Sequence, residues 1–276
     1  MQKSILITGC SSGIGYDAAH GLAARGWRVF ATCRKQRDCD RLEGEGLESF
    51  PLDYASEDSL SAAVDETLSR TGGTLDALFN NGAFACPGAM EDLPRAALAE
   101  VFETNVFGYH DLTRRLIPTM RAQGHGRIIN NSSVLGLVPM KWRGAYVASK
   151  YALEGLSDTW RLEMADAGIK VILIEPGPVT SSIRVKSIPQ FVKWIDWKGS
   201  VRKDQYESQL LKRLYKDSGT RDRFELPASA VTRKLLHALH SNDPHPRYFV
   251  TRPTYVANIL RRFATTRMVD RIWGGG

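Results

Sequence analysis

Short apolar runs alternate with amphipathic segments along the first 175 residues, and this alternation restricts the possible folds more than any other feature. The runs are rich in β-branched and aromatic residues and fit buried strands, whereas the intervening segments repeat apolar residues at helical spacing. Strands that alternate with helices form right-handed βαβ units, which build a parallel sheet covered on both faces. Strands are expected at residues 4–8, 27–32, 47–52, 75–79, 127–131, 169–175 and, further on, 247–251.

Helices are expected between these strands. The first carries apolar residues from Ile14 at three- and four-residue spacing and stops at Gly26, and another begins near Ser56 with acidic residues in its first turn. Longer helices are expected at 94–120 and 145–167. Because no linker, internal repeat or low-complexity tract interrupts the 276 residues, we predict one doubly wound α/β domain spanning residues 1–276.

Composition restricts the class of protein and the cellular location that we expect. Hydrophobic residues make up 43% of the chain and charged residues 24%, as in globular proteins with a substantial core, and no apolar run approaches the roughly 20 residues that span a bilayer. Four cysteines occur without CxxC spacing and without a secretory leader, so neither a disulfide framework nor a metal site is expected. These features favour a reducing, cytoplasmic location.

The net charge of +7 is concentrated in the C-terminal third. Residues 184–223 hold eleven Lys and Arg against five Asp and Glu, and residues 252–271 hold five Arg against one Asp. A nucleic-acid surface would need such cations on one face together with aromatic or groove-entering elements, so no nucleic-acid partner is expected.

A glycine-rich turn joins the first strand to the first helix. Glycines permit a sharp turn and close approach of a ligand to the backbone, while the helix N-terminus offers unpaired N–H groups and the positive end of its dipole. This context is typical of pyrophosphate binding, although a tight turn without a ligand is the alternative. The residues of the turn are Thr8, Gly9, Cys10, Ser11, Ser12, Gly13, Ile14 and Gly15.

Several motifs occur in an order that resembles the short-chain dehydrogenase/reductase family. They are Thr8-Gly9-xxx-Gly13-Ile14-Gly15, Asn80-Asn81, Asn105, Ser133 and Tyr146-xxx-Lys150. The resemblance implies a Rossmann fold and hydride transfer between a nicotinamide cofactor and a carbonyl or alcohol. Within the family the chain is most similar to bacterial NADP-dependent aldehyde reductases and to retinol and 17β-hydroxysteroid dehydrogenase-like members.

Four residues are the expected catalytic set. Tyr146 and Lys150 lie four apart and so share one helix face, where the ammonium is expected to lower the pKa of the phenol. The resemblance implies that Tyr146 is the general acid/base, that Ser133 hydrogen-bonds the substrate oxygen, and that Asn105 positions a water that contacts Lys150. An isolated YxxxK pair or helical asparagine would otherwise be an ordinary surface feature.

Cofactor preference depends on the end of the second strand. An acidic residue commonly binds the adenosine ribose there, but Cys33 stands at that position and is followed by Arg34 and Lys35. Two cations can meet a 2′-phosphate through charge-assisted hydrogen bonds, so NADP(H) is favoured over NAD(H). The alternative is that both cations belong to a solvated loop.

The resemblance implies further cofactor contacts. Asp53 should contact adenine, Asn81 the adenosine ribose region, and the loop after the sixth strand the nicotinamide. Two departures stand out: the family's Asn-Asn-Ala-Gly is Asn-Asn-Gly-Ala at residues 80–83, and the usual threonine of the later loop falls on Ser181, with Thr180 adjacent. The implied loop residues are Pro176, Gly177, Val179 and Ser181.

Residues 184–225 are the expected variable substrate-binding lid, helical and mobile. Its aromatic residues, together with Trp142, would line an apolar pocket for a retinoid, steroid or long-chain aldehyde. Structural packing of the tryptophans, with the cations solvated, is an equally good interpretation.

Other functions and assemblies are open at this stage. A non-catalytic NADPH-binding regulator is the alternative to an enzyme, although such a regulator has no need of all four catalytic residues. Residues 255–273 form a basic amphipathic stretch for which peripheral contact with a membrane surface is possible but not favoured; the alternative is that its apolar face covers the sheet or a subunit interface. Relatives are often dimers or tetramers, so a homo-oligomer is possible.

Overall fold

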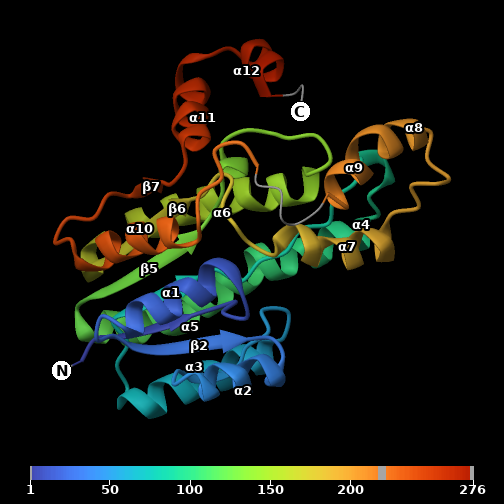
Figure 1. Ribbon diagram of the computed structural model, residues 1–276. Helices are drawn as coiled ribbons and strands as arrows, with labels where there is room; N and C mark the ends of the chain where they lie inside the picture. Colours follow the sequence, from blue (N-terminus) through green and yellow to red (C-terminus); the bar gives the residue numbers. More distant parts are fainter. Residues whose placement is uncertain (1, 217–221, 274–276) are drawn as a thin grey trace.

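Seven parallel strands form one sheet in the order β3-β2-β1-β4-β5-β6-β7 in the computed structural model, which describes residues 2–216 and 222–273 (Figure 1). Every strand expected from the sequence is present, with ends that differ by at most two residues. The sheet and its helices confirm a single-domain, doubly wound Rossmann-like fold. The strands are β1 (Ser4–Ile7), β2 (Arg28–Cys33), β3 (Glu48–Pro51), β4 (Ala77–Asn80), β5 (Gly126–Asn131), β6 (Ile169–Glu175) and β7 (Arg247–Phe249).

Helices cover both faces of the sheet. One apolar cluster packs α1, α2 and α10 against one face, and a second packs α3, α5 and α6 against the other. The helices of these two layers are α1 (Gly13–Ala23), α2 (Gln36–Gly44), α3 (Glu57–Thr71), α5 (Gly108–Gln123), α6 (Gly144–Glu163) and α10 (Ser229–His240).

The expected helix at 94–120 is divided into three parts. α4 (Arg95–Phe102) continues into a π-helical turn at Glu103–Phe107 and then into α5. A π-helical turn inserts one residue into the helical ladder and often accompanies a functional site. Here the inserted turn contains the candidate residue Asn105.

The described part of the expected lid is helical, as predicted. It contains α7 (Ile183–Trp194), α8 (Lys203–Gln205), a π-helical turn at Tyr206–Leu210 and α9 (Leu211–Leu214). Phe191, Tyr206 and Leu214 are buried in a third apolar cluster against α4 and α6. The rest of the predicted lid includes residues 217–221, which lie outside the described residues.

Two helices follow the last strand and stand away from the sheet (Figure 1). The amphipathic stretch expected at 255–273 forms α11 (Arg252–Phe263) and α12 (Thr266–Trp273). In the described residues, no helix combines the length and apolar character needed to cross a bilayer.

Candidate active site

The candidate site residues follow the carboxyl ends of the strands. In a parallel sheet these ends share one edge, and ligands bind where the order of connections reverses, here between β1 and β4. The structure therefore brings together residues that are as many as 168 positions apart in sequence. Along this edge lie Thr8 after β1, Arg34 after β2, Asp53 after β3, Asn81 after β4, Ser133 after β5 and Pro176 after β6.

The glycine turn leaves no room for side chains. Gly9 has φ +69°, and a Cβ there would lie 2.5 Å from Cα of Gly82. At Gly15 a Cβ would lie 2.5 Å from the carbonyl oxygen of Gly9 and 2.6 Å from the side chain of Asn81. The backbones after β1 and β4 thus approach each other directly. Glycine at position 82, where the family usually has alanine, fits this close contact with Gly9.

Thr8 joins the two halves of the site. Its hydroxyl accepts hydrogen bonds from the backbone N–H groups of Asn81 (2.8 Å) and Gly82 (3.0 Å) and lies 2.8 Å from the hydroxyl of Tyr54. The Asn81 amide donates to the Thr8 carbonyl (2.9 Å) and accepts from Asn131 (2.8 Å). Asn81 is therefore fixed between β1 and β5.

The N-terminus of α1 is arranged for an anion. Ser12 occupies the N-cap without a side-chain capping bond, and the first turn holds no acidic residue. Lys186 of α7 reaches this turn, where its ammonium donates to the hydroxyls of Ser11 (3.0 Å) and Ser12 (2.7 Å). A cation beside the positive end of a helix dipole is unfavourable by itself. A bound phosphate would be attracted both by the ammonium and by the helix N-terminus, and would therefore offset this repulsion.

Lys186 is a site residue that the sequence reasoning missed. The cationic character of residues 184–223 was visible in the sequence. However, a lysine on a helix some 175 residues after the turn has no fixed spacing to it. Only the fold places α7 over the glycine turn.

Loop residues after β6 also cover this turn. At Gly13, φ is +63° and a Cβ would lie 3.3 Å from Cβ of Ser181. Thr180 is engaged elsewhere, because its hydroxyl donates to Glu225 (2.7 Å). The geometry thus brings Ser181, rather than Thr180, to the glycine turn.

Gly177 and Pro176 fix the start of the same loop. The Pro176 carbonyl accepts a hydrogen bond from the backbone N–H of Val134 (2.7 Å), and a Cβ at Gly177 would overlap the hydroxyl of Thr251 at 2.1 Å. Val179 forms an isolated parallel bridge with Leu226. The loop is held between β5 and the segment that precedes α10.

Tyr146 lies on the first turns of α6, beside Ser133. Burial raises the pKa of Tyr146 to about 12, and the hydrogen bond with Ser133 and the charge of Arg143 oppose this rise. The expected lowering of the Tyr146 pKa by Lys150 is wrong, because burial dominates and raises this pKa. At neutral pH the phenol is therefore protonated.

Lys150 is buried one turn further along α6. Its ammonium donates to the carbonyl of Asn131 (2.7 Å) and lies 5.5 Å from the centre of the Tyr146 ring. Burial lowers the pKa of Lys150 to about 7, while the charge of Glu154 opposes this shift. The lysine can thus gain or lose a proton close to neutral pH.

Asn105 is fully buried in the π-helical turn. Its amide donates to the carbonyl of Phe84 (2.9 Å) and to the hydroxyl of Ser149 (3.1 Å), and its oxygen accepts from the backbone N–H of Phe84 (3.1 Å). Asn105 therefore joins the segment after β4 to α6, the helix that carries Tyr146 and Lys150. The water that the resemblance implies between Asn105 and Lys150 stays a prediction.

The part of the sheet edge that follows β2 and β3 is polar and exposed. Arg34 and Lys35 are exposed after β2, whereas Cys33 is buried in the core. Burial raises the pKa of the Cys33 thiol to about 12, so this residue adds no charge to the site. Asp53 bonds locally, with its backbone N–H donating to Ser59 (2.9 Å) and its carboxylate accepting from the N–H of Ala55 (3.1 Å).

A buried ionic cluster lies behind the site. Arg247 of β7 contacts the carboxylates of Glu154 (2.9 Å) and Asp158 (2.9 Å), and its Nε lies 3.1 Å from Glu175 without a hydrogen bond between them. Burial, together with the negative charge of Glu154, raises the pKa of Glu175 to about 9. No local sequence pattern predicts this cluster, because its members come from α6, β6 and β7.

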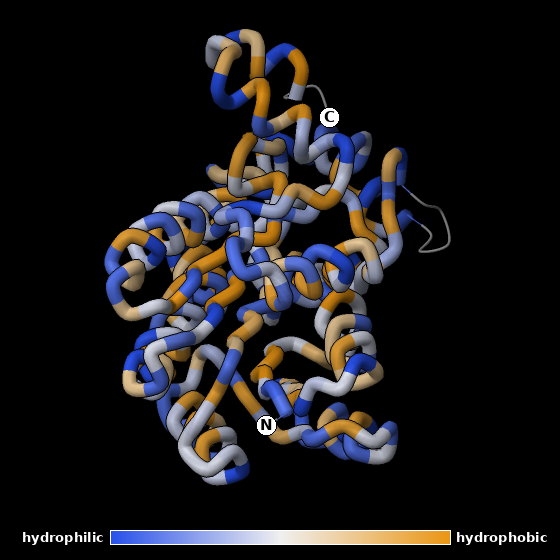
Figure 2. The backbone as a smooth tube through the Cα atoms, turned by 90° about the vertical axis from the view of Figure 1, so that its left-hand side faces the viewer, coloured by the Kyte–Doolittle hydropathy of each residue, from blue (hydrophilic) through white to orange (hydrophobic). Residues whose placement is uncertain are grey.

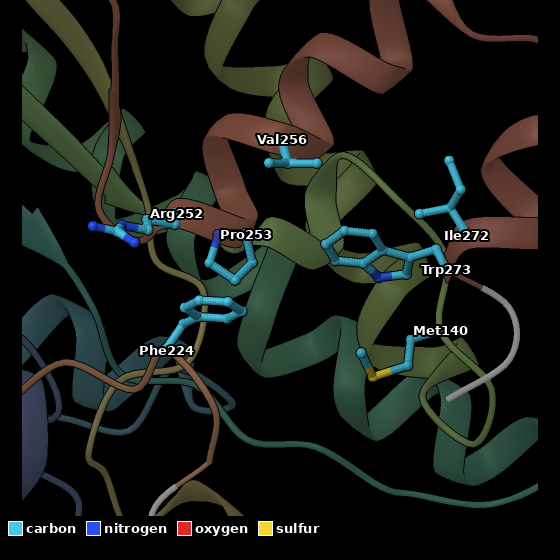
Figure 3. Close-up of a pocket in the computed structure, with 7 residues that line it drawn as sticks. All are labelled: Met140, Phe224, Arg252, Pro253, Val256, Ile272 and Trp273. Carbon is cyan, nitrogen blue, oxygen red and sulfur yellow. The ribbon is translucent and has the colours of Figure 1, made fainter.

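An apolar groove of about 640 Å³ lies between α11, α12 and the loops that carry Met140 and Phe224 (Figure 3). Met140 and Trp273 line the groove and pack in the same apolar cluster as Tyr146. Trp142 instead packs against Tyr206, with ring centres 4.9 Å apart, as the structural interpretation of the tryptophans predicts. The groove is lined by Met140, Phe224, Arg252, Pro253, Val256, Ile272 and Trp273.

A family model described as short chain dehydrogenase matches residues 3–190, which contain the turn, Ser133, Tyr146 and Lys150. The chain belongs to the short-chain dehydrogenase family. It is therefore an oxidoreductase of that family, and the resemblance seen in its motifs is confirmed. Among the described residues, no group of three or more His, Cys, Asp or Glu side chains is placed to hold a metal ion.

Two relatives match nearly the whole chain. An uncharacterized oxidoreductase of Escherichia coli strain K12, YbbO, is 40% identical over 275 residues, covering 100% of this chain and 95% of that protein. Human retinol dehydrogenase 16 is 32% identical over 281 residues, covering 98% of this chain and 87% of that protein. Both alignments extend past residue 190 into the C-terminal region.

Solved structures of the family share the fold. A short-chain dehydrogenase from Streptomyces avermitilis has a TM-score of 0.77 at 26% identity, covering 99% of this chain and 96% of that one. A family member from Burkholderia phymatum, solved in complex with NAD, has a TM-score of 0.77 at 24% identity, covering 100% and 96%. The second likeness supports the fold alone.

Proposed function

We propose that this chain transfers a hydride between NADP(H) and an apolar carbonyl or alcohol, with Tyr146 as general acid/base. The observation that carries the proposal is the arrangement of Tyr146 beside Ser133 and above buried Lys150, at the edge where the glycine turn meets β4. When bound, the nicotinamide supplies the hydride chemistry, while the protein supplies orientation and proton transfer.

The glycine turn fits the pyrophosphate of such a cofactor. Side chains at Gly9 or Gly15 would overlap neighbouring backbone, and the uncapped N-terminus of α1 points its N–H groups at the same space. Lys186, Ser11 and Ser12 would contact the phosphates. Ser181, Val179, Gly177 and Pro176 would border the nicotinamide, with Asn81 at the adenosine ribose and Asp53 at the adenine.

Proton transfer would be assigned to Tyr146 and Lys150, with Ser133 and Asn105 in supporting roles. A phenol with a pKa of about 12 is a proton donor at neutral pH, as reduction of a carbonyl requires. Ser133 would hydrogen-bond the substrate oxygen as negative charge develops there. Lys150, with a pKa of about 7, would return the proton to Tyr146, and Asn105 would hold α6 in place for this exchange.

Arg34 and Lys35 support a preference for NADP(H). Both are exposed at the end of β2, beside the adenosine end of the site, and no carboxylate occupies the position of Cys33. A guanidinium and an ammonium can bind a 2′-phosphate through charge-assisted hydrogen bonds. NADH lacks that phosphate and would lose these contacts.

The groove and the segment at 184–225 support an apolar substrate. Phe224 belongs to this segment and lines the groove, so the segment would act as the substrate-binding lid. Retinoids, steroids and long-chain aldehydes share the required chemistry, a reactive oxygen at the end or edge of an apolar body. Human retinol dehydrogenase 16, a relative by sequence, is named for a substrate of this kind.

The test is the change in absorbance of the reduced nicotinamide band with aliphatic, aromatic, retinoid and steroid carbonyls. Oxidation of NADPH faster than NADH by an apolar carbonyl is the expected result. Tight NADPH binding without turnover on any carbonyl would instead support a regulator that only binds the cofactor.

A further inference from the structure

Six large apolar side chains are exposed on α11 and α12, in a stretch of 22 residues. Tyr255, Ile259 and Phe263 repeat every four residues and so form one stripe along α11, and Phe263 is 84% exposed. Met268 and Ile272 form the matching stripe on α12. The exposed set is Tyr255, Val256, Ile259, Phe263, Met268 and Ile272.

Cations accompany the apolar stripes. Residues 252–273 carry five Arg and one Asp, a formal charge of +4. Arg261 is occupied by the body of the protein, since it donates to the carbonyl of Gly136 (3.2 Å) and stacks on Tyr151. Within the described part of the chain, no carboxylate lies at ion-pair distance from Arg262, Arg267 or Arg271.

The two helices are held in place but only partly covered. Ala257, Val269 and Trp273 pack on the apolar cluster around Leu135 and Val138, while the residues of the two stripes are exposed. Figure 2 shows apolar and polar residues alternating along α11 and α12, which stand off from the rest of the molecule. The exposed stripes are therefore presented on a fixed support.

We propose that α11 and α12 form a docking surface for an anionic lipid bilayer. Apolar stripes bordered by arginine match the interfacial region of a bilayer, where apolar side chains enter the acyl boundary and cations meet anionic headgroups. A second copy of the chain fits less well, because a self-complementary contact would bring two surfaces of charge +4 together.

The apolar groove opens beside this surface. Val256 and Ile272 belong both to the exposed set and to the groove lining, as Figure 3 shows, and Met140 and Trp273 pack on the same cluster around Leu135 and Val138 as Tyr146 does. If the proposed function holds, an apolar substrate would enter from the bilayer along this path. The docking surface itself depends on no cofactor or turnover.

Cosedimentation of the full chain with vesicles of phosphatidylcholine, with or without phosphatidylglycerol, tests the proposal. Binding is expected with phosphatidylglycerol, weaker binding at higher salt, and little binding to phosphatidylcholine alone. Because each cation near an anionic surface contributes about 1 kcal/mol, Arg267→Glu with Arg271→Glu should weaken binding at least about 25-fold.

Two controls distinguish vesicle binding through α11 and α12 from nonspecific binding through basic or apolar residues elsewhere on the protein. Lys203→Glu with Lys212→Glu makes the same change in charge on exposed residues of α8 and α9 and should leave binding nearly unchanged. Phe263→Ser should weaken binding, whereas Val201→Ser, at the most exposed apolar residue outside these helices (93%), should not.

Absent binding to anionic vesicles, or equal loss in the two charge-reversal variants, would overturn the proposal. A dimer in sedimentation velocity that Phe263→Ser disrupts, without vesicle binding, would assign the face to a second copy and also overturn it. Reduction of a water-soluble carbonyl, measured in parallel, reports on the proposed function and is expected to be unaffected by the Arg267→Glu, Arg271→Glu and Phe263→Ser substitutions, which lie outside both the lid segment and the groove lining.

Discussion

At the scale of single residues, burial decides the chemistry of the site. Tyr146 and Lys150 share a helix face, as their spacing predicts, yet burial raises the pKa of the phenol and lowers that of the ammonium. Both shifts favour the neutral form of the group, because water stabilises the charged form better than the protein interior does. Tyr146 is thus protonated at neutral pH, and Lys150 can exchange its proton close to neutral pH.

Arg34→Ala should weaken NADPH binding about 10-fold to 100-fold and leave NADH binding within about twofold. The reason is that a hydrogen bond to a charged group contributes about 1.5–3 kcal/mol, and only NADPH carries the 2′-phosphate. Titration calorimetry with each cofactor measures the effect. Arg25→Ala, at the opposite end of α1, is the control, and an equal loss for both cofactors would contradict the assigned contact.

Glu175→Gln should stabilise the protein more at pH 9 than at pH 6. The folded chain holds the Glu175 proton up to a pKa of about 9, whereas the unfolded chain releases it near the ordinary value of 4.5. The contribution of Glu175 to the free energy of unfolding is therefore fully present below about pH 4.5. It falls as pH rises toward 9, by at most about 1.4 kcal/mol per pH unit.

Glutamine carries no proton to lose, so the advantage of the variant should grow across that window. Denaturant unfolding of Glu175→Gln and of the wild-type protein at several pH values measures it. Glu43→Gln, on the exposed side of α2, serves as the control. A constant difference between Glu175→Gln and wild type from pH 6 to pH 9 would argue against a protonated Glu175.

At the scale of elements, the turn before α1 and the first half of α6 bear the site. The turn depends on glycine because the backbones after β1 and β4 nearly touch, whereas α6 tolerates change away from its buried face. Gly155 lies on the exposed side of α6, and a Cβ there would meet nothing within 4 Å. The same substitution should therefore have opposite effects in the two elements.

Gly15→Ala should destabilise the protein and weaken cofactor binding, since its Cβ would lie 2.5 Å from a carbonyl oxygen. Gly155→Ala should instead stabilise it by about 0.5–1 kcal/mol, because alanine favours a helix interior. Thermal unfolding and NADPH titration of both variants measure these effects. Unchanged NADPH affinity in Gly15→Ala would show that the turn does not cradle the cofactor.

Much of this element-level structure could be predicted from the sequence, because β-branched runs and glycine stops are local signals. The seven strands, the Ser56 cap of α3 and the helix that bears Tyr146 follow from such signals. α2 was missed because it buries only Cys39 and Leu42 among charged residues. α10 was missed although Val231, Leu235 and Leu239 repeat at helical spacing.

The parts that could not be predicted depend on contacts between distant segments. Lys186 reaches Ser11 and Ser12 only because α7 folds over the glycine turn. The raised pKa of Glu175 results from burial near residues of α6 and β7, which no local pattern reveals. Likewise, the groove forms between α11, α12 and loops that are far apart in the chain.

At the scale of the whole molecule, the sheet order gathers the polar candidate site residues along one edge. The site residues come from six strand ends, so a bound cofactor would connect most of the sheet. A ligand that binds only the folded state raises its stability in proportion to the logarithm of ligand concentration. Cofactor preference should therefore appear in thermal unfolding.

NADPH at 100 times its dissociation constant should stabilise the protein by about 2.7 kcal/mol and raise Tm by roughly 5–10 °C. NADH at the same concentration should raise Tm by clearly less, because it lacks the phosphate that Arg34 and Lys35 would bind. Differential scanning fluorimetry with each cofactor measures this. Equal shifts would contradict the NADP(H) preference.

The central claim is that Tyr146 transfers the proton while the rest of the site binds the cofactor. The most direct test compares NADPH oxidation by wild type and Tyr146→Phe with one apolar aldehyde, alongside NADPH affinity. Turnover should fall about 10²-fold to 10⁴-fold, with NADPH affinity within about twofold of wild type. Turnover by Tyr146→Phe within about twofold of wild type would contradict the account.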